Sequence, residues 1–85
     1  MTSSEMRVKR ATYRAHHRGT KELDFLLGRF ADATLQDMSE VELDAFEELL
    51  ALPDPQIDAW IKGQDVPPAL DGLIRLIRRH HGLVD

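Results

Sequence analysis

Cysteine is absent from the 85-residue sequence. Disulfides, thiolate nucleophiles and sulfur-ligated zinc or iron–sulfur centres are therefore excluded, and the composition suits a reducing cytosol. Serine occurs only at positions 3, 4 and 39, without a G-x-S-x-G elbow. The five glycines are scattered and form neither a phosphate-cradling loop nor a flavin-binding fingerprint. We expect no catalytic residues, no cofactor-binding residues and no stably bound cofactor.

Long apolar runs are also missing. No stretch approaches the roughly 20 residues that a membrane span requires. The first ten residues, "MTSSEMRVKR", contain basic side chains but lead into no apolar segment. We expect neither export nor membrane insertion through signals of the chain's own, and a cytoplasmic location. The length fits one small domain over residues 1–85.

The net charge of −4 is unevenly distributed. Residues 1–30 hold seven Lys/Arg and three Asp/Glu, residues 31–71 hold one and eleven, and residues 72–85 hold three and one. Because the acidic middle would repel phosphate, nucleic acid is not expected as a partner.

The pattern of apolar residues and helix breakers predicts an all-α, compact five-helix bundle. The expected helices span about 5–17, 21–33, 40–51, 55–62 and 68–81, and no segment has the alternation of a strand. Each of the last four has an apolar stripe with the spacing of one helix face. The stripes are Leu23, Leu26, Leu27 and Phe30; Leu43, Phe46, Leu49 and Leu50; Ile57, Trp60 and Ile61; and Leu70, Leu73, Ile74 and Ile77. The first helix has only Met6, Val8, Ala11 and Ala15, so we expect it to pack loosely.

Local signals mark several helix ends. Thr20 is a candidate N-cap for the second helix, and Ser39 followed by Glu42 is typical of a capping box. Asp54 and Pro55 suggest an N-cap and first helical residue for the fourth helix.

Two kinds of polar cluster invite a functional interpretation. The pairs His16-His17 and His80-His81 suggest a metal, but adjacent residues on a helix point about 100° apart, so no metal site is expected. We interpret these histidines as solvated groups near helix ends. The carboxylates of the third helix form either a solvated face or a docking surface for a basic partner; they are Glu40, Asp44, Glu47 and Glu48.

The stretch "HRGTKELD" carries the most specific signal. Gly19 can end a helix, Thr20 can cap the next one and Glu22 complements its dipole, but Arg18 has no such structural explanation. At these residues the chain resembles the small bacterial and mitochondrial assembly factors that promote flavin attachment to the flavoprotein subunit of succinate dehydrogenase. Their R-G-x-x-E motif matches Arg18, Gly19 and Glu22. The stretches "LDFLLGRF" and "LLALPDPQIDAWI" extend the resemblance to about residues 10–80, with His17 in place of a frequent arginine.

The resemblance implies a five-helix bundle that is not an enzyme but a maturation chaperone. It would bind the flavoprotein subunit of succinate dehydrogenase, or that of the related fumarate reductase, as a monomer. The flavin would then be attached to a histidine by the client itself. The competing interpretations are a helical interaction or antitoxin-like regulatory module with another client, a helix-turn-helix DNA binder and, more remotely, an enzyme.

The resemblance and the corner position of the motif suggest a partner-binding site. We hypothesise that Arg18 and Glu22 contact the client and that Gly19 permits close backbone approach. Arg14, His17 and Asp24 are further candidates because they neighbour the motif on adjacent turns. A Gly19→Arg substitution is expected to block docking without unfolding the bundle.

Overall fold

The protein is an all-α bundle. The computed structural model describes residues 3–83, and no strand occurs in that range. Its helices are α1 (Ser3–His16), α2 (Lys21–Thr34), α3 (Glu40–Leu50), α4 (Asp54–Ile61) and α5 (Asp71–His80), with short 3₁₀ turns η1 (Leu35–Asp37) and η2 (Pro68–Leu70). The predicted five-helix fold is confirmed. No helix within residues 3–83 combines the length and apolarity needed to cross a membrane.

The helix bounds differ from the expected ones mainly at the two ends of the chain. Helix α1 begins two residues earlier than expected, at Ser3. The fifth helix was expected from residue 68, but α5 begins at Asp71 because the segment before it forms the η2 turn. In that turn the Leu70 amide donates to the Pro67 carbonyl at 3.0 Å, the shorter-range bond of a 3₁₀ helix.

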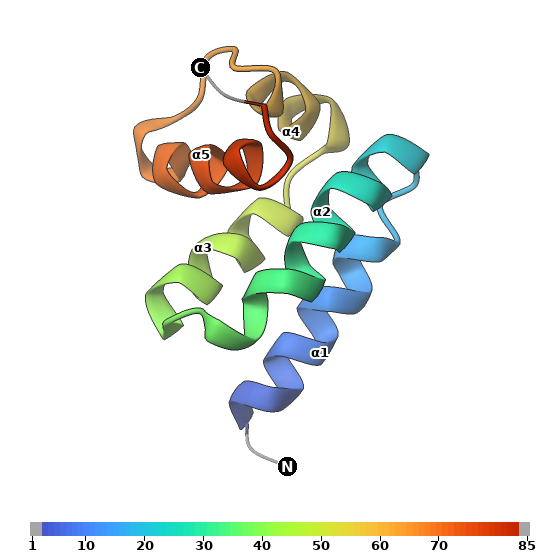
Figure 1. Ribbon diagram of the computed structural model, residues 1–85, viewed down its shortest axis with the longest axis vertical. Coiled ribbons are helices and arrows are strands. Elements are labelled where there is room, and N and C mark those ends of the chain that lie inside the picture. The colour runs from blue at the N-terminus through green and yellow to red at the C-terminus, as the bar shows by residue number, and fades with distance from the viewer. Residues whose placement is uncertain (1–2, 84–85) are drawn as a thin grey trace.

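Helices α1 and α2 form an antiparallel pair along the long axis of the molecule (Figure 1). Helix α3 packs against one end of the α1–α2 pair, and helices α4 and α5 cover the other end of the pair. The expected apolar stripes of α2 to α5 meet between these helices, with the Phe30 and Phe46 ring centres 5.9 Å apart. Trp60 is buried as expected, and Leu26 is only partly buried.

The expectation that the first helix packs loosely is wrong. Ala11 and Ala15 are fully buried, and such small side chains let two helix backbones approach closely. The ring of His16 also lies directly over Gly28 of α2, where an added Cβ would come within 2.5 Å of His16 Nδ1. Met6, which was placed on the buried face, is instead 50% exposed.

The acidic side of α3 is not simply solvated, because part of it holds α1. The Arg7 guanidinium donates to Asp44 at 2.5 Å and to Glu47 at 2.6 Å. These carboxylates, Glu47 first, raise the pKa of Arg7 above its ordinary value. Glu40 and Glu48 are exposed. Two of the four predicted acidic side chains therefore face solvent, and the other two bind Arg7 of α1.

Candidate functional site

The R-G-x-x-E motif lies in the tight loop between α1 and α2. Gly19 has a φ of +107°, in the left-handed region that side chains rarely adopt. Thr20 caps α2 as predicted, since its side chain accepts a hydrogen bond from the Leu23 amide at 3.2 Å. The Asp24 carboxylate in turn accepts from the Arg18 amide at 2.5 Å. Hydrogen bonds to α2 therefore hold the loop on both sides of Gly19, through Thr20 and through the Arg18 amide.

The side chain of Arg18 points into the protein and not toward solvent. Its Nε and Nη2 donate to Asp54 Oδ1 at 3.0 and 2.8 Å, and Nη2 also donates to the Leu52 carbonyl at 2.8 Å. Nη1 donates to the Leu50 carbonyl. Leu50 is the last residue of α3, where a helix leaves its last acceptors unsatisfied, and Leu52 lies in the turn that follows. Arg18 thus joins the α1–α2 loop to the end of α3 and the start of α4.

This geometry gives Arg18 the structural role that the sequence did not suggest. Its side chain is only 11% exposed, so little of it can reach a partner while these bonds are intact. Asp54 had been expected to cap α4 with its side chain, and this was wrong. Pro53 occupies the N-cap position without a side-chain bond, and the Asp54 carboxylate is used by Arg18.

Beside Asp54, the partner of Arg18, the surface near the motif loop presents a shallow hollow. Its volume is ≈ 430 Å³, and it is lined by Thr20, Glu22, Leu23, Asp54, Pro55 and Asp58. Glu22 is exposed at its edge. The Lys62 ammonium pairs with Asp58 at 2.8 Å, and Asp58 first, then Glu22, raise the pKa of Lys62 above its ordinary value. The hollow is thus lined by apolar side chains and by three carboxylates, of which Asp54 and Asp58 are paired with Arg18 and Lys62.

The remaining predicted site residues are divided between the interior and the surface. Asp24 is partly buried against the loop, whereas Gly19 and Glu22 are exposed. His17 and Arg14 are exposed on the side of α1. The His17 ring stacks on Tyr13 with 4.0 Å between ring centres. An added Cβ on Gly19 would lie 3.8 Å from Asp54 Oδ2, an ordinary van der Waals contact, so the strain of a Gly19→Arg substitution would come from the backbone φ of +107°.

The other histidines have structural contacts that their interpretation as solvated groups missed. His16 Nε2 lies 2.9 Å from Asp32 Oδ1, and His81 Nε2 lies 2.7 Å from the Leu26 carbonyl oxygen. His80 meets the edge of Phe30. In the part of the chain that the structure describes, no group of three or more His, Cys, Asp or Glu side chains is arranged to hold a metal ion.

Sequence reasoning missed Asp54 as a partner of the motif. The only available signal was its place in the "LPDP" stretch, which was assigned to helix capping instead. The structure also assigns Arg78 a contact that its sequence position did not suggest. Arg78 Nη1 donates to the Ile61 carbonyl at the end of α4.

The fold and the motif loop together define a class of protein. It is a small helical bundle that exposes a short loop between α1 and α2, and hydrogen bonds to α2 and to Asp54 hold this loop in place. A family model described as "Flavinator of succinate dehydrogenase" matches residues 9–81. The chain belongs to this family, and the resemblance inferred from the motif is confirmed.

Curated relatives agree with the family model. The chain is 41% identical over 58 residues to an FAD assembly factor SdhE of Acetobacter pasteurianus, covering 68% of this chain and 53% of the relative. It is 44% identical over 69 residues to a mitochondrial succinate dehydrogenase assembly factor 2 of Scheffersomyces stipitis, covering 78% and 46%. The corresponding protein of Dictyostelium discoideum is 35% identical over 74 residues, covering 86% and 52%. The chain therefore spans about half the length of these relatives. No solved structure matches significantly.

Proposed function

We propose that the protein is an FAD assembly factor that binds the flavoprotein subunit of succinate dehydrogenase and promotes covalent attachment of its flavin. The observation that carries this proposal is the family match over residues 9–81, which includes the braced motif loop. The flavoprotein of fumarate reductase is a second client to test. The protein acts in the cytoplasm, as a monomer and without a stably bound cofactor of its own.

The proposed action is to favour one conformation of the client. A protein that binds one conformation more tightly shifts the population toward it, by as much as its differential affinity. In that conformation a histidine of the client is held against the flavin, and the covalent bond forms between these two groups. The assembly factor supplies orientation, while the bond chemistry belongs to the client and its cofactor.

The proposed contact surface is the motif corner. Gly19 and Glu22 are exposed there and supply close backbone approach and a carboxylate acceptor. His17 and Arg14 extend the surface along α1. Arg18 and Asp24 hold the loop in shape and do not contact the client. Two bonds support this assignment: the Arg18 amide donates to Asp24, and the Arg18 guanidinium donates to Asp54.

The test is flavin fluorescence of the denatured flavoprotein subunit after its production with or without the assembly factor. Wild-type protein should raise covalent flavin, and Glu22→Ala should reduce that gain. Glu48→Ala is the matched control, because Glu48 is also an exposed helical glutamate but lies on α3. Covalent flavin that does not respond to the wild-type protein, with folded client and FAD present, would contradict the proposed function.

A further inference from the structure

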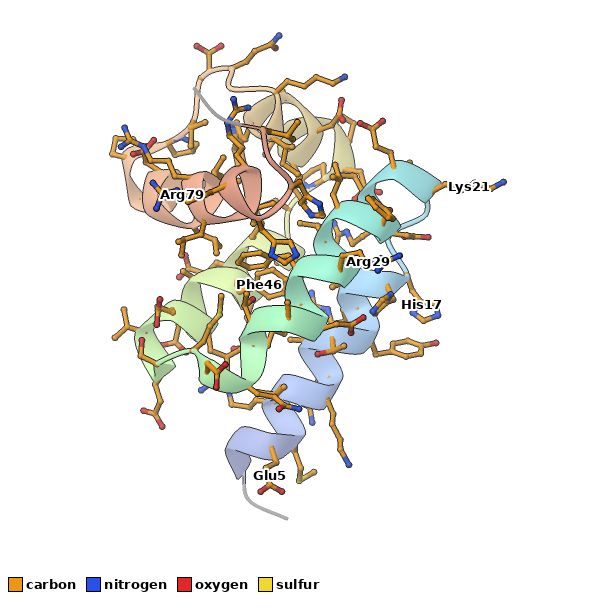
Figure 2. All side chains as sticks on the ribbon, viewed as in Figure 1. Glu5, His17, Lys21, Arg29, Phe46 and Arg79 are labelled. Carbon is orange, nitrogen blue, oxygen red and sulfur yellow. The ribbon has the colours of Figure 1, made fainter. Side chains whose placement is uncertain are left out.

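One side of the α1–α2 pair presents aromatic and cationic side chains that the fold leaves outside its core. Tyr13 is 66% exposed and Phe25 is 54% exposed. Figure 2 shows His17 and Arg29 on the same side of the molecule. Tyr13 stacks on His17, and Arg29 lies over Phe25. With exposed Arg14, these residues form what we call the aromatic–arginine face: Tyr13, Arg14, His17, Phe25 and Arg29.

The rings of this face are held in place within the free protein. The Tyr13 and His17 rings stack at 4.0 Å with an interplanar angle of 19°. His17 Nδ1 also lies 2.7 Å from the Tyr13 carbonyl oxygen. The Phe25 ring has two neighbours. Its centre lies 5.2 Å from the guanidinium carbon of Arg29 and 5.7 Å from the centre of the His81 ring. Side chains that are ordered beforehand lose less entropy on binding.

Single exposed apolar residues are common on protein surfaces and need no explanation. Here, however, the exposed residues are aromatics grouped with arginines, the types that are enriched in protein interfaces and among their energetic hot spots. The face also adjoins the motif loop, because His17 immediately precedes Arg18. Grouping, pairing and position therefore set it apart from a scatter of solvated side chains.

The positive charge on α1 falls into two groups. Arg7 points toward α3, where Asp44 and Glu47 compensate it. Arg10 and Arg14 follow Arg7 at i+3 and i+7 on the same helix, and both are exposed. In a chain with a net charge of −4, this outward side is locally cationic. It is complementary to carboxylates, which guanidinium groups bind through charge-assisted hydrogen bonds.

The arrangement of apolar residues favours a protein surface over a membrane. A helix that binds a membrane surface exposes a continuous apolar stripe. The apolar stripe of α1 is turned inward, with Ala11 and Ala15 fully buried against the bundle. The large apolar side chains that remain exposed on α1 and α2 are Met6 and the two aromatic rings, Tyr13 and Phe25, which do not form a continuous stripe. Two rings among cations fit an apolar side chain surrounded by carboxylates.

We propose that the aromatic–arginine face is a second contact region for the flavoprotein client and receives an acidic protein segment that carries an apolar side chain. This inference rests on the proposed function for the identity of the client. It adds Tyr13, Phe25 and Arg29 to the contact surface, and it makes that surface continuous from the motif loop along α1 and α2.

The experiment measures binding of the full chain to the FAD-loaded flavoprotein subunit, at low and at high salt. The test variant is Phe25→Ser with Arg29→Glu. The control is Val41→Ser with Arg75→Glu, which also replaces one exposed apolar side chain and reverses one exposed arginine charge, on α3 and α5. Circular dichroism verifies the fold. Arg75 is paired with Asp71, so the fold of the control is verified in the same way. A second test variant, Tyr13→Ser with Arg14→Glu, probes the same face from α1 should the first variant be unfolded.

We expect the test variants to weaken binding by about tenfold or more and to reduce its dependence on salt, with the control within about twofold of wild type. Equal binding by test and control variants would overturn the inference and leave the proposed function standing. Failure of the wild-type chain to bind the flavoprotein would overturn both. Capture of the wild type, but not the test variant, by phosphatidylglycerol vesicles would overturn the protein partner in favour of an anionic membrane.

Discussion

Replacing Arg18 by alanine should destabilise the bundle, although the residue belongs to a surface motif. The substitution removes the donors of Asp54 and of the Leu50 and Leu52 carbonyls. The Asp54 side chain is only 22% exposed, so water can replace the lost bonds only in part. Loss of one partner from a mostly buried, hydrogen-bonded pair is costly because the other charge stays behind.

The magnitude follows from these groups. An acceptor left unsatisfied in a protein interior costs roughly 1–3 kcal/mol, and partial exposure places this site at the lower end for each group. We therefore expect a loss of about 3 kcal/mol, out of a total stability of roughly 4–13 kcal/mol for a chain of this length. In a domain of this size that corresponds to a fall in melting temperature of at least about 12 °C.

The assay is urea and thermal unfolding followed by circular dichroism. Arg14→Ala is the matched control, because this arginine is exposed on α1, and its loss should change stability by no more than about 0.5 kcal/mol. A double-mutant cycle with Asp54→Asn should give a coupling energy of about 1 kcal/mol or more. A loss below about 1 kcal/mol for Arg18→Ala would refute the reasoning and restore Arg18 as a free contact residue.

Three further changes test other parts of the fold. Gly19→Ala should cost about 1–2 kcal/mol in unfolding experiments, because its φ of +107° strains any side chain. Gly28→Ala should displace the His16 ring, at a cost of about 1–3 kcal/mol and with altered His16 resonances in NMR spectra. The bonds from Ser39, its amide first, lower the pKa of Glu42 below its ordinary value. This stabilisation is therefore present above the ordinary pKa of a glutamate and is lost as pH falls through the lowered pKa. Ser39→Ala should cost about 1 kcal/mol at neutral pH, and it should keep most of the wild-type loss of stability in acid, because the amide of residue 39 still donates to Glu42.

The sequence predicted the elements whose causes are local. The capping box of Ser39 and Glu42 and the Thr20 cap involve residues three apart, and both are confirmed. The apolar stripes of α2 to α5 were also predictable, since helix periodicity alone determines which side chains share a face. The position of the motif in the α1–α2 loop followed from Gly19, because this glycine can end a helix.

The contacts that required the tertiary fold were not predictable from local patterns. Arg18 and Asp54 are 36 residues apart. Asp54 had a local interpretation as a helix cap, and Arg18 was assigned to client contact, so neither residue pointed to the other. The same is true of Arg7 with Glu47, 40 residues apart, and of His81 with the Leu26 carbonyl, 55 residues apart. In each case a polar side chain that periodicity places at the surface instead joins one helix to another.

Loss of function at the motif can therefore have two physical origins, which temperature separates. If Arg18 acts by bracing the loop, Arg18→Ala should support less flavin attachment near 37 °C and recover toward wild type at about 15–20 °C, where stability is usually greatest. Glu22→Ala should remain impaired at both temperatures, because Glu22 is exposed and its loss leaves the braced loop intact. The measurement is covalent flavin in the client, alongside the folded fraction of each variant. An Arg18→Ala protein that is fully folded yet inactive at the lower temperature would show that the arginine itself must meet the client.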